Sequence, residues 1–367
     1  MNVLLLASHG IAEYDDIRMF HHLGYDVFCP GGYANPASPG ETLRLALPDV
    51  PYHADLAALC EIQRGKHPEA PGRYIDWAKA DLHPGIIEWA DVIIAHHFVR
   101  EWIRDQWPRI RHKRVVWRTC GQSDPGLERD MAPLHDDGLQ IVRYSPAERR
   151  YFEAIGAFAG EDALIRFGKF PQDYGPWEPS YLYGPGDPDV PPFVGNVTQN
   201  MVERGDAVGL SFWLDATRGL PARPAGPGSQ QLPGGVGALG YDAMRAYLRR
   251  VGVYLYTGTT PAPYTLGLIE ALMTGTPVVS IGREAWAGPP SLFEGAELAP
   301  WQVDTPEHFR EIAPAFLDKA PDQALVESAR IRDQAIDTFG IETIGRLWLA
   351  FLGNRKASRT SPWDAVL

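Results

Sequence analysis

The chain has 367 residues, of which 45% are hydrophobic and 22% charged, and its net charge is −12. This length exceeds what one hydrophobic core ordinarily organises and predicts two domains. The acidic balance disfavours binding to nucleic acid by the whole surface. No apolar run reaches the roughly 20 residues that a membrane-spanning helix needs. We therefore expect a soluble globular protein.

The first residues, MNVLLLASHG, are apolar over only a short run with no basic residues before it. We expect a buried strand here and not a secretory signal peptide. The cysteines Cys29, Cys60 and Cys120 are widely spaced and odd in number. They predict neither a disulfide framework nor a zinc site, and they fit a reducing compartment. A cytoplasmic location is expected.

The first half of the chain alternates short apolar runs, typical of buried strands, with segments of helical spacing. Pro108 is expected to end the second helix. This alternation predicts a parallel sheet with helices on both faces. The expected strands are 2–8, 91–97, 114–121, 139–145 and 162–168, with a strand and turn at 25–32, and the expected helices are 13–24, 98–107 and 146–156.

A Pro/Gly-rich stretch at 171–192 indicates a connection between two domains. We expect a first domain at 1–188, a second at 189–340, and a closing helix with a polar tail at 341–367. Within the second domain the stretch 223–240 is expected to be rich in loops. Its expected helices are 203–217, 241–252 and 265–275, and its expected strands are 253–258 and 277–282.

The most informative stretch is YTLGLIEALMTGTPVVSIG, residues 264–282. Thr265 suits the N-cap of its helix and Gly275 suits the residue just past the C-terminus. A loop of small residues, 257–263, leads into this helix, whose exposed N–H groups favour a diphosphate. Glu270 is the one carboxylate of the helix. It could accept two ribose hydroxyls, or point outward and pair with a surface arginine.

This stretch resembles the donor-site signature of the retaining GT-B glycosyltransferases of family 4, in which a helix with a Glu-x7-Glu pattern runs into GTPVV. The resemblance places the ribose-binding second glutamate on Glu270. The first glutamate falls on Ala262 and is missing. The backbone amides around Tyr264, Thr265 and Leu266 are implied to face the donor phosphates and sugar.

Two upstream segments extend the resemblance. FVGNVTQNMVERG puts Arg204 in the place of the diphosphate-binding lysine and Asn196 in the place of an arginine. GALGYDAMRAYLRRVGVYLY implies that Gly240 and Tyr241 border the nucleoside base. Together with Thr259, in the loop before the helix, these residues complete the expected donor site.

In the first half only the order of elements resembles the family. His96 matches a histidine that lines the acceptor side, and the second such histidine falls on Cys120. His9, at the end of the first strand, could be a catalytic base of an inverting enzyme or a turn histidine. Gly10 could let a sugar approach the backbone. Arg118, at a strand's end, could steady donor phosphates or an acidic acceptor, so the candidate catalytic residues are His96, His9 and Arg118.

Two other patterns point elsewhere. GVGALG, residues 235–240, matches the dinucleotide fingerprint, but no buried strand precedes it and no acidic residue follows about twenty residues on. The run 100–118 is basic and contains Trp102, Trp107 and Trp117. It predicts either a solvated helix face with a polar loop or a patch for anionic lipid headgroups or nucleic acid. The second alternative would mean peripheral contact with the inner membrane face.

The residues and the resemblance together predict an α/β protein of the GT-B class: two Rossmann-like domains facing across a cleft. The N-terminal domain would bind the acceptor and the C-terminal domain a UDP- or GDP-sugar. The implied reaction is hexosyl transfer to a hydroxyl, with retention and without a metal or other cofactor. The acceptor could be a glycan, a lipid, a small molecule or a modified nucleic-acid base. A nucleotide-sugar epimerase on the same fold and a non-catalytic nucleotide-sugar-binding protein are the alternatives.

Overall fold

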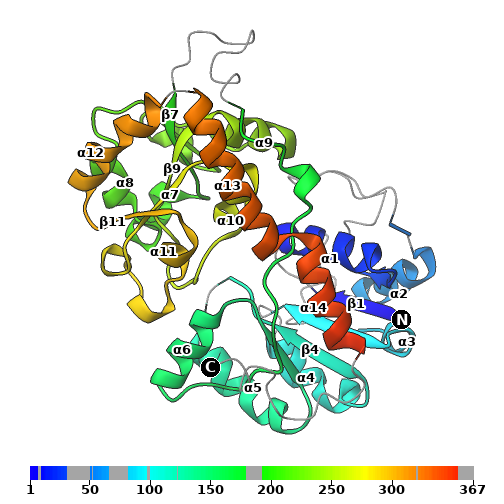
Figure 1. The fold of residues 1–367 in the computed structure, drawn as a ribbon. Coiled ribbons are helices and arrows are strands. Elements are labelled where there is room, and N and C mark those ends of the chain that lie inside the picture. Colours follow the sequence, from blue (N-terminus) through cyan, green and yellow to red (C-terminus); the bar gives the residue numbers. More distant parts are fainter. Residues whose placement is uncertain are drawn as a thin grey trace. The chain divides into compact units, whose positions relative to one another are not determined.

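The computed structural model describes residues 1–6, 10–30, 50–51, 53–65, 82–96, 100–121, 123–178, 192–319 and 321–353. By its internal contacts the chain divides into unit 1, residues 1–168 with 344–367, and unit 2, residues 169–343 (Figure 1). The first crossing between the units lies between Gly168 and Lys169. The expected boundary, between 188 and 189, lies outside the described residues.

Unit 1 contains a sheet of six parallel strands in the order β2-β1-β3-β4-β5-β6. Every expected strand is present, and β4, β5 and β6 end earlier than expected. Strand β3 is buried at every residue, as strands covered on both faces are. The strands are β1 (Asn2–Leu6), β2 (Asp26–Phe28), β3 (Val92–His96), β4 (Arg114–Arg118), β5 (Gln140–Arg143) and β6 (Ala163–Leu164).

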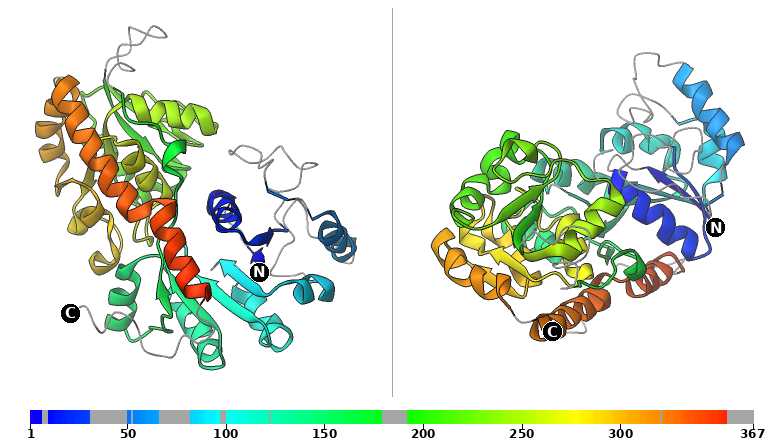
Figure 2. Two further views of the ribbon diagram at one scale, coloured as in Figure 1. Left: turned by 45° about the vertical axis from the view of Figure 1, so that its right-hand side comes forward. Right: turned by 90° about the horizontal axis from the view of Figure 1, so that it is seen from above.

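The helices of unit 1 include α1, which packs beside β1 and β2 and appears in blue in two further views (Figure 2). Helix α4 continues through Pro108, so the expectation that this proline ends the helix was wrong. Pro108 lies in the last turn, and the buried side chains of Trp107 and Ile110 hold that turn against the core. The helices are α1 (Gly10–His22), α2 (Ala54–Gly65), α3 (Pro84–Trp89), α4 (Arg100–Ile110), α5 (Pro125–Asp136) and α6 (Pro146–Ala154).

The tryptophans of the basic run, Trp102, Trp107 and Trp117, are buried in the hydrophobic core of unit 1. The aromatic part of the run is therefore core packing and not a surface patch. Helix α14 (Ile341–Gly353) joins unit 1 from residue 344 onward. Its Trp348 ring lies edge-on to Phe20, with ring centroids 5.0 Å apart.

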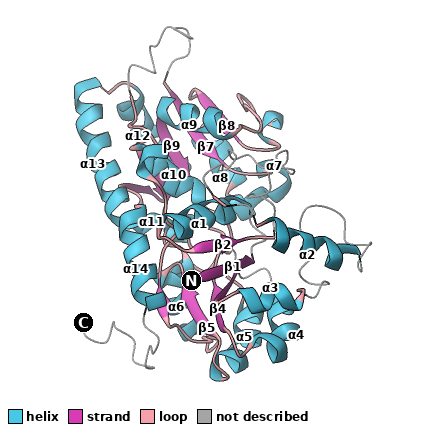
Figure 3. Ribbon diagram, turned by 90° about the vertical axis from the view of Figure 1, so that its right-hand side faces the viewer, coloured by secondary structure: helices cyan, strands magenta, loops and turns pink. Residues whose placement is uncertain are grey.

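Unit 2 contains a second parallel sheet, in the order β11-β10-β9-β7-β8 (Figure 3). Strand β8 lies in a stretch expected to be loop. It is an edge strand and contains Pro224, a residue that parallel sheets tolerate at their edges. The strands are β7 (Phe193–Val197), β8 (Ala222–Ala225), β9 (Val251–Tyr256), β10 (Val278–Ile281) and β11 (Trp301–Val303).

The helix expected at 203–217 is interrupted by a 3₁₀ turn at 205–208. Gly205 and Gly209 adopt positive φ angles of 55° and 71°, which a continuous right-handed helix does not contain. None of the described helices combines the length and the apolar character that a membrane span requires. The helices are α7 (Met201–Arg204), α8 (Leu210–Ala216), α9 (Tyr241–Arg250), α10 (Leu266–Thr274), α11 (Gly295–Leu298), α12 (Pro306–Leu317) and α13 (Pro321–Phe339).

Candidate functional site

The order of strands in unit 2 reverses between β7 and β9, because β7 has β8 on one side and β9 on the other. In open parallel sheets, ligands bind beyond the carboxyl ends of the strands at such a reversal. The segments that leave these two strands are residues 198–209 and 257–265. They contain Arg204, Thr259 and the start of α10, so most of the expected donor site gathers at this edge.

The two segments are fastened to each other. The backbone N–H of Thr260 donates to the Ala207 carbonyl at 2.7 Å, and the Thr257 hydroxyl donates to the Val208 carbonyl at 2.7 Å. Gly209 is needed at this junction, since a Cβ there would stand 2.8 Å from the Thr257 Cβ. The segment carrying Arg204 is thereby held against the loop that leads into α10.

Arg204 is the last residue of α7, and its side chain is half-buried. Burial lowers the pKa of its guanidinium. Within the part of the chain that the structure describes, no carboxylate forms an ion pair with it. A cation partly removed from water without a counter-charge favours an anionic ligand.

Helix α10 begins beside this arginine-bearing segment. Thr265 is its N-cap and accepts a hydrogen bond from the Leu268 N–H at 3.4 Å. The preceding loop is fixed on its far side, because the N–H groups of Glu294 and Gly295 both donate to the Pro263 carbonyl, at 3.0 and 3.2 Å. The positive end of a nine-residue helix is thus presented on a braced loop.

Other expected donor residues lie around the same helix start. Thr259, Thr265 and Leu266 are partly exposed, whereas Tyr264 is buried with its ring centroid 5.9 Å from that of Phe339. These positions leave the first three residues accessible to a ligand at the edge of the sheet.

Glu270 lies inside unit 2 and is only 2% exposed. Its Oε1 accepts hydrogen bonds from the Lys169 ammonium at 3.0 Å and from the Tyr174 hydroxyl at 3.1 Å. The alternative in which Glu270 points outward to a surface arginine is therefore wrong. Its role as a ribose ligand stays a prediction, and any ribose would meet a carboxylate that Lys169 already holds.

Sequence reasoning did not find Lys169. The available cue was a lysine between Gly168 and Phe170 in RFGKF, residues 166–170, a segment in which Arg166 is charged as well. No spacing rule connects it with Glu270, which lies 101 residues further along the chain. The pairing becomes visible only in the folded chain.

Asn196 is 1% exposed, and its amide is used within the protein. The amide nitrogen donates to the Leu255 carbonyl at 2.8 Å, and the amide oxygen accepts from the Thr198 hydroxyl at 2.6 Å. In this structure the side chain joins the ends of β7 and β9. Its expected contact with the donor stays a prediction.

Gly240 and Tyr241 lie at the start of α9, beyond the end of β8. Gly240 is exposed, and the Tyr241 side chain is buried with the Arg245 guanidinium carbon 4.5 Å from its ring centroid. The two residues lie in the connection that leads from β8 to β9, and β8 is the neighbour of β7 in the sheet.

In unit 1, His96 and Arg118 share one carboxylate. His96 Nε2 lies 3.0 Å from Asp16 Oδ2, and an Arg118 guanidinium N–H donates to the same oxygen at 2.6 Å, with all three side chains buried. Burial lowers the pKa of His96, but the charge of Cys120 and hydrogen bonds to Asp16 and Cys120 raise it to about 9. The contact with Asp16 therefore favours the protonated form of His96. His9 lies outside the described residues, and Gly10 is the first residue of α1.

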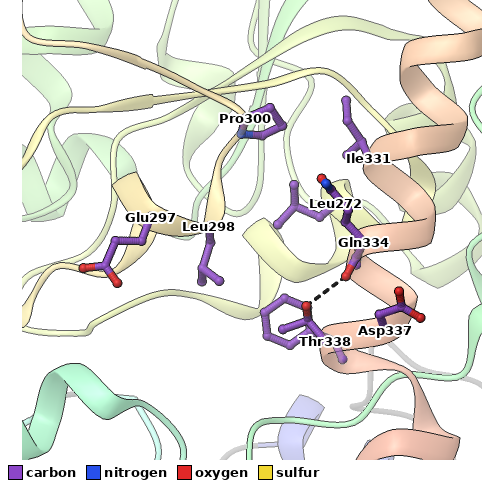
Figure 4. A pocket seen from close by; sticks show the side chains of 10 residues that line it. Leu272, Glu297, Leu298, Pro300, Ile331, Gln334, Asp337 and Thr338 are labelled. Atoms are coloured by element: carbon purple, nitrogen blue, oxygen red, sulfur yellow. Dashed lines mark hydrogen bonds between the residues drawn. The ribbon is translucent and has the colours of Figure 1, made fainter. Parts of the chain in front are cut away.

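A pocket of about 360 Å³ opens elsewhere in unit 2 (Figure 4). Its wall includes Leu272, which leaves α10 on roughly the opposite side from Glu270 because the two are two residues apart. None of the expected donor residues lines it. The lining residues are Leu272, Glu297, Leu298, Pro300, Ile331, Gln334, Ala335, Asp337, Thr338 and Phe339.

No known protein family and no curated protein matches the sequence. Solved structures do resemble the chain over nearly its whole length. HepE from Anabaena in complex with UDP-glucose is 16% identical, with a TM-score of 0.62 over 96% of this chain and 99% of that chain. Sucrose-phosphate synthase from Thermosynechococcus elongatus is 14% identical, with a TM-score of 0.61 over 97% and 98%.

A glycosyltransferase from Rickettsia africae ESF-5 is 12% identical, with a TM-score of 0.61 over 96% of this chain and 99% of that chain. At such identities the similarity establishes the fold. It confirms the expected α/β class, with two Rossmann-like units as in GT-B glycosyltransferases.

Proposed function

We propose that the protein is a glycosyltransferase that moves a sugar from a nucleoside-diphosphate sugar to an acceptor hydroxyl. The observation that carries the proposal is Arg204, a half-buried cation to which the described residues supply no counter-charge. Its segment is hydrogen-bonded to the loop before α10. An arginine beside the positive end of a helix matches the charge of a diphosphate. The structure of HepE, of similar fold, was solved with UDP-glucose, which supports a UDP-sugar as the first donor to test.

In the proposed reaction the bond between the anomeric carbon and the diphosphate oxygen breaks, a bond to the acceptor oxygen forms, and the proton of the acceptor hydroxyl passes to the departing diphosphate. The departing diphosphate gains negative charge. Arg204 and the backbone amides of Thr265 and Leu266 stabilise that charge as it develops. Glu270 binds the ribose, and Gly240 with Tyr241 borders the base.

We propose retention at the anomeric carbon, with charge compensation by Arg204 and the helix instead of a metal. An inverting reaction needs a base to deprotonate the acceptor. His9 is the base considered for inversion, and it lies outside the described residues, whereas His96 is held by Asp16 with its pKa raised to about 9. NMR of the product's anomeric proton distinguishes the two outcomes, and an inverted product would contradict the proposal.

The test begins with calorimetric titration of the purified chain with UDP, GDP and ADP. We expect one of them to bind and to raise the melting temperature, because a ligand that binds only the folded state stabilises it. Failure of all three to bind contradicts the proposal. The matching UDP- or GDP-sugar is then incubated with candidate acceptors.

The product assay separates the proposed function from its alternatives. Transfer to an acceptor, or slow release of free sugar to water, supports a transferase. Binding with neither outcome favours a non-catalytic nucleotide-sugar-binding protein. Interconversion of the sugar nucleotide without an acceptor establishes an epimerase.

A further inference from the structure

Lys169 is the first residue of unit 2, and its side chain is completely buried. Its ammonium lies 3.0 Å from Glu270 Oε1 and 5.8 Å from the centroid of the Tyr174 ring. The Tyr174 hydroxyl donates to the same Glu270 oxygen at 3.1 Å. One oxygen of the carboxylate is therefore fixed in position by two donors, and its charge is compensated by one of them.

The backbone of Lys169 is fixed as well. Its N–H donates to the Phe339 carbonyl at 2.8 Å, and its carbonyl accepts from the Ile341 N–H at 2.9 Å. Lys169 thus pairs in parallel with Gly340, in the segment that carries the chain out of unit 2. Because the backbone of Lys169 is held by these hydrogen bonds, its ammonium can fix the orientation of the Glu270 carboxylate.

A carboxylate accepts two hydroxyls well only when it is ionised. A buried carboxylate without a cation takes up a proton instead, because burial disfavours the charged form. Among the described residues, the groups facing Glu270 include Lys169, Tyr174 and Tyr254, and Arg332 of α13 donates to the Tyr174 carbonyl at 3.1 Å. Of these, Lys169 is the cation in direct contact with the carboxylate.

We propose that Lys169 is a positioning residue for nucleoside recognition: it keeps the Glu270 carboxylate ionised and oriented so that this carboxylate can accept the ribose hydroxyls. The inference rests on the proposed function, in which a nucleoside diphosphate binds at α10. It assigns to Lys169 the discrimination between a ribose and a sugar that lacks its hydroxyls. The diphosphate contacts belong to Arg204 and the helix start.

The test compares a nucleoside diphosphate with its 2′,3′-dideoxy analogue by calorimetry. The wild-type chain should bind the ribonucleotide about tenfold or more tightly, since hydrogen bonds to a charged group contribute about 1.5–3 kcal/mol. In Lys169→Met the ratio of the two affinities, ribonucleotide over dideoxy analogue, should fall close to one at neutral pH. It should recover as rising pH ionises Glu270. Lys169→Arg should retain part of the discrimination, and Lys319→Met, which loses an ion pair with Glu327 elsewhere in unit 2, should retain all of it.

If Lys169→Met does not fold, Lys169→Gln replaces it, because its neutral amide can still donate to Glu270. Unchanged discrimination in a folded Lys169→Met or Lys169→Gln variant overturns the inference. A wild-type chain that binds both nucleotides equally also overturns it. A wild-type chain that binds neither contradicts the proposed function instead, so the two failures are distinguishable.

Discussion

Arg143 binds both carboxylate oxygens of Glu128 inside unit 1. Its two terminal nitrogens donate to Glu128 Oε1 at 2.9 Å and Oε2 at 2.7 Å, and both side chains are buried. Arg143 also donates to the Gly160 carbonyl, and the Ala159 N–H donates to Glu128 Oε2. The pair therefore joins α5, β5 and the segment after α6 with its hydrogen-bonding groups satisfied.

Replacing Arg143 with methionine should lower the free energy of unfolding by about 3–5 kcal/mol, because Glu128 would remain as a buried charge without its cation. Urea denaturation at neutral pH measures the change. Arg104→Met is the control, since Arg104 lies in the same unit, is exposed and pairs with the exposed Asp105. It should change the free energy by less than about 1 kcal/mol. Equal effects of the two substitutions would contradict the importance of the buried pair.

We expect Glu148 to make the stability of the protein depend on pH. Its carboxylate accepts from the Thr119 hydroxyl at 2.7 Å and the Ser123 hydroxyl at 3.1 Å, and it is fully buried. Burial raises the pKa of Glu148 from 4.5 to about 7, against the lowering effect of Arg143 and the hydroxyls. Between pH 4.5 and 7 the folded state binds more protons than the unfolded state, so stability falls as the pH rises through this window.

Glu148→Gln should remove this dependence and leave a variant that is more stable than wild type above pH 7, by up to about 3 kcal/mol. Thermal denaturation at several pH values between 4.5 and 8 checks it. The amide keeps the shape of the side chain, so the comparison isolates the charge. A wild-type stability that is flat or rises over pH 4.5–7 relative to Glu148→Gln would show that the carboxylate is not protonated in the folded protein.

A test of ribose binding by Glu270 requires a substitution that destabilises the fold less than alanine does. Glu270→Ala would leave the buried ammonium of Lys169 without a counter-charge, at a cost of about 3–5 kcal/mol, so lost binding would be confounded with lost folding. Glu270→Gln also removes the counter-charge of Lys169, but it retains an oxygen that can accept from Lys169 and Tyr174, so it should cost less stability. We expect this variant to bind the nucleoside diphosphate about tenfold more weakly, because the ribose loses a charged acceptor. Unchanged affinity at a temperature below its melting point would contradict the ribose role.

The strands were predictable where burial on both faces leaves a continuous apolar run, as in β1 and β3. Strand β8, ARPA, has no such run because it lies at a sheet edge, and it was expected to be loop. The single helix expected at 203–217 failed because an apolar pattern does not reveal which glycines adopt positive φ, as Gly205 and Gly209 do. Local pattern therefore predicted buried elements better than edges and interruptions.

In the candidate site, too, local features were predictable and contacts between distant residues were not. Thr265 as N-cap and Gly275 as the C-terminal glycine follow from local backbone chemistry and were predictable. The partner of Glu270 was not, since Lys169 is distant in sequence. The environment of His96 was also not predictable, because Asp16 comes from another element and Arg118 was expected to face a ligand instead of that carboxylate. Ion pairs between buried residues that are distant in the sequence produce no recognisable sequence pattern.

The role of Arg204 is tested by Arg204→Ala with two ligands, a nucleoside diphosphate and the free nucleoside. Affinity for the diphosphate should fall about 10- to 100-fold, the loss expected for a charge-assisted hydrogen bond, while affinity for the nucleoside should stay within about twofold. Arg218→Ala is the control, since Arg218 lies in the same unit, is exposed and pairs with Asp215. Because Arg204 carries no described counter-charge, its removal leaves no buried carboxylate behind, and the fold should be unaffected. Equal losses for the two ligands would place Arg204 away from the phosphates, and the diphosphate would then depend on the helix start alone.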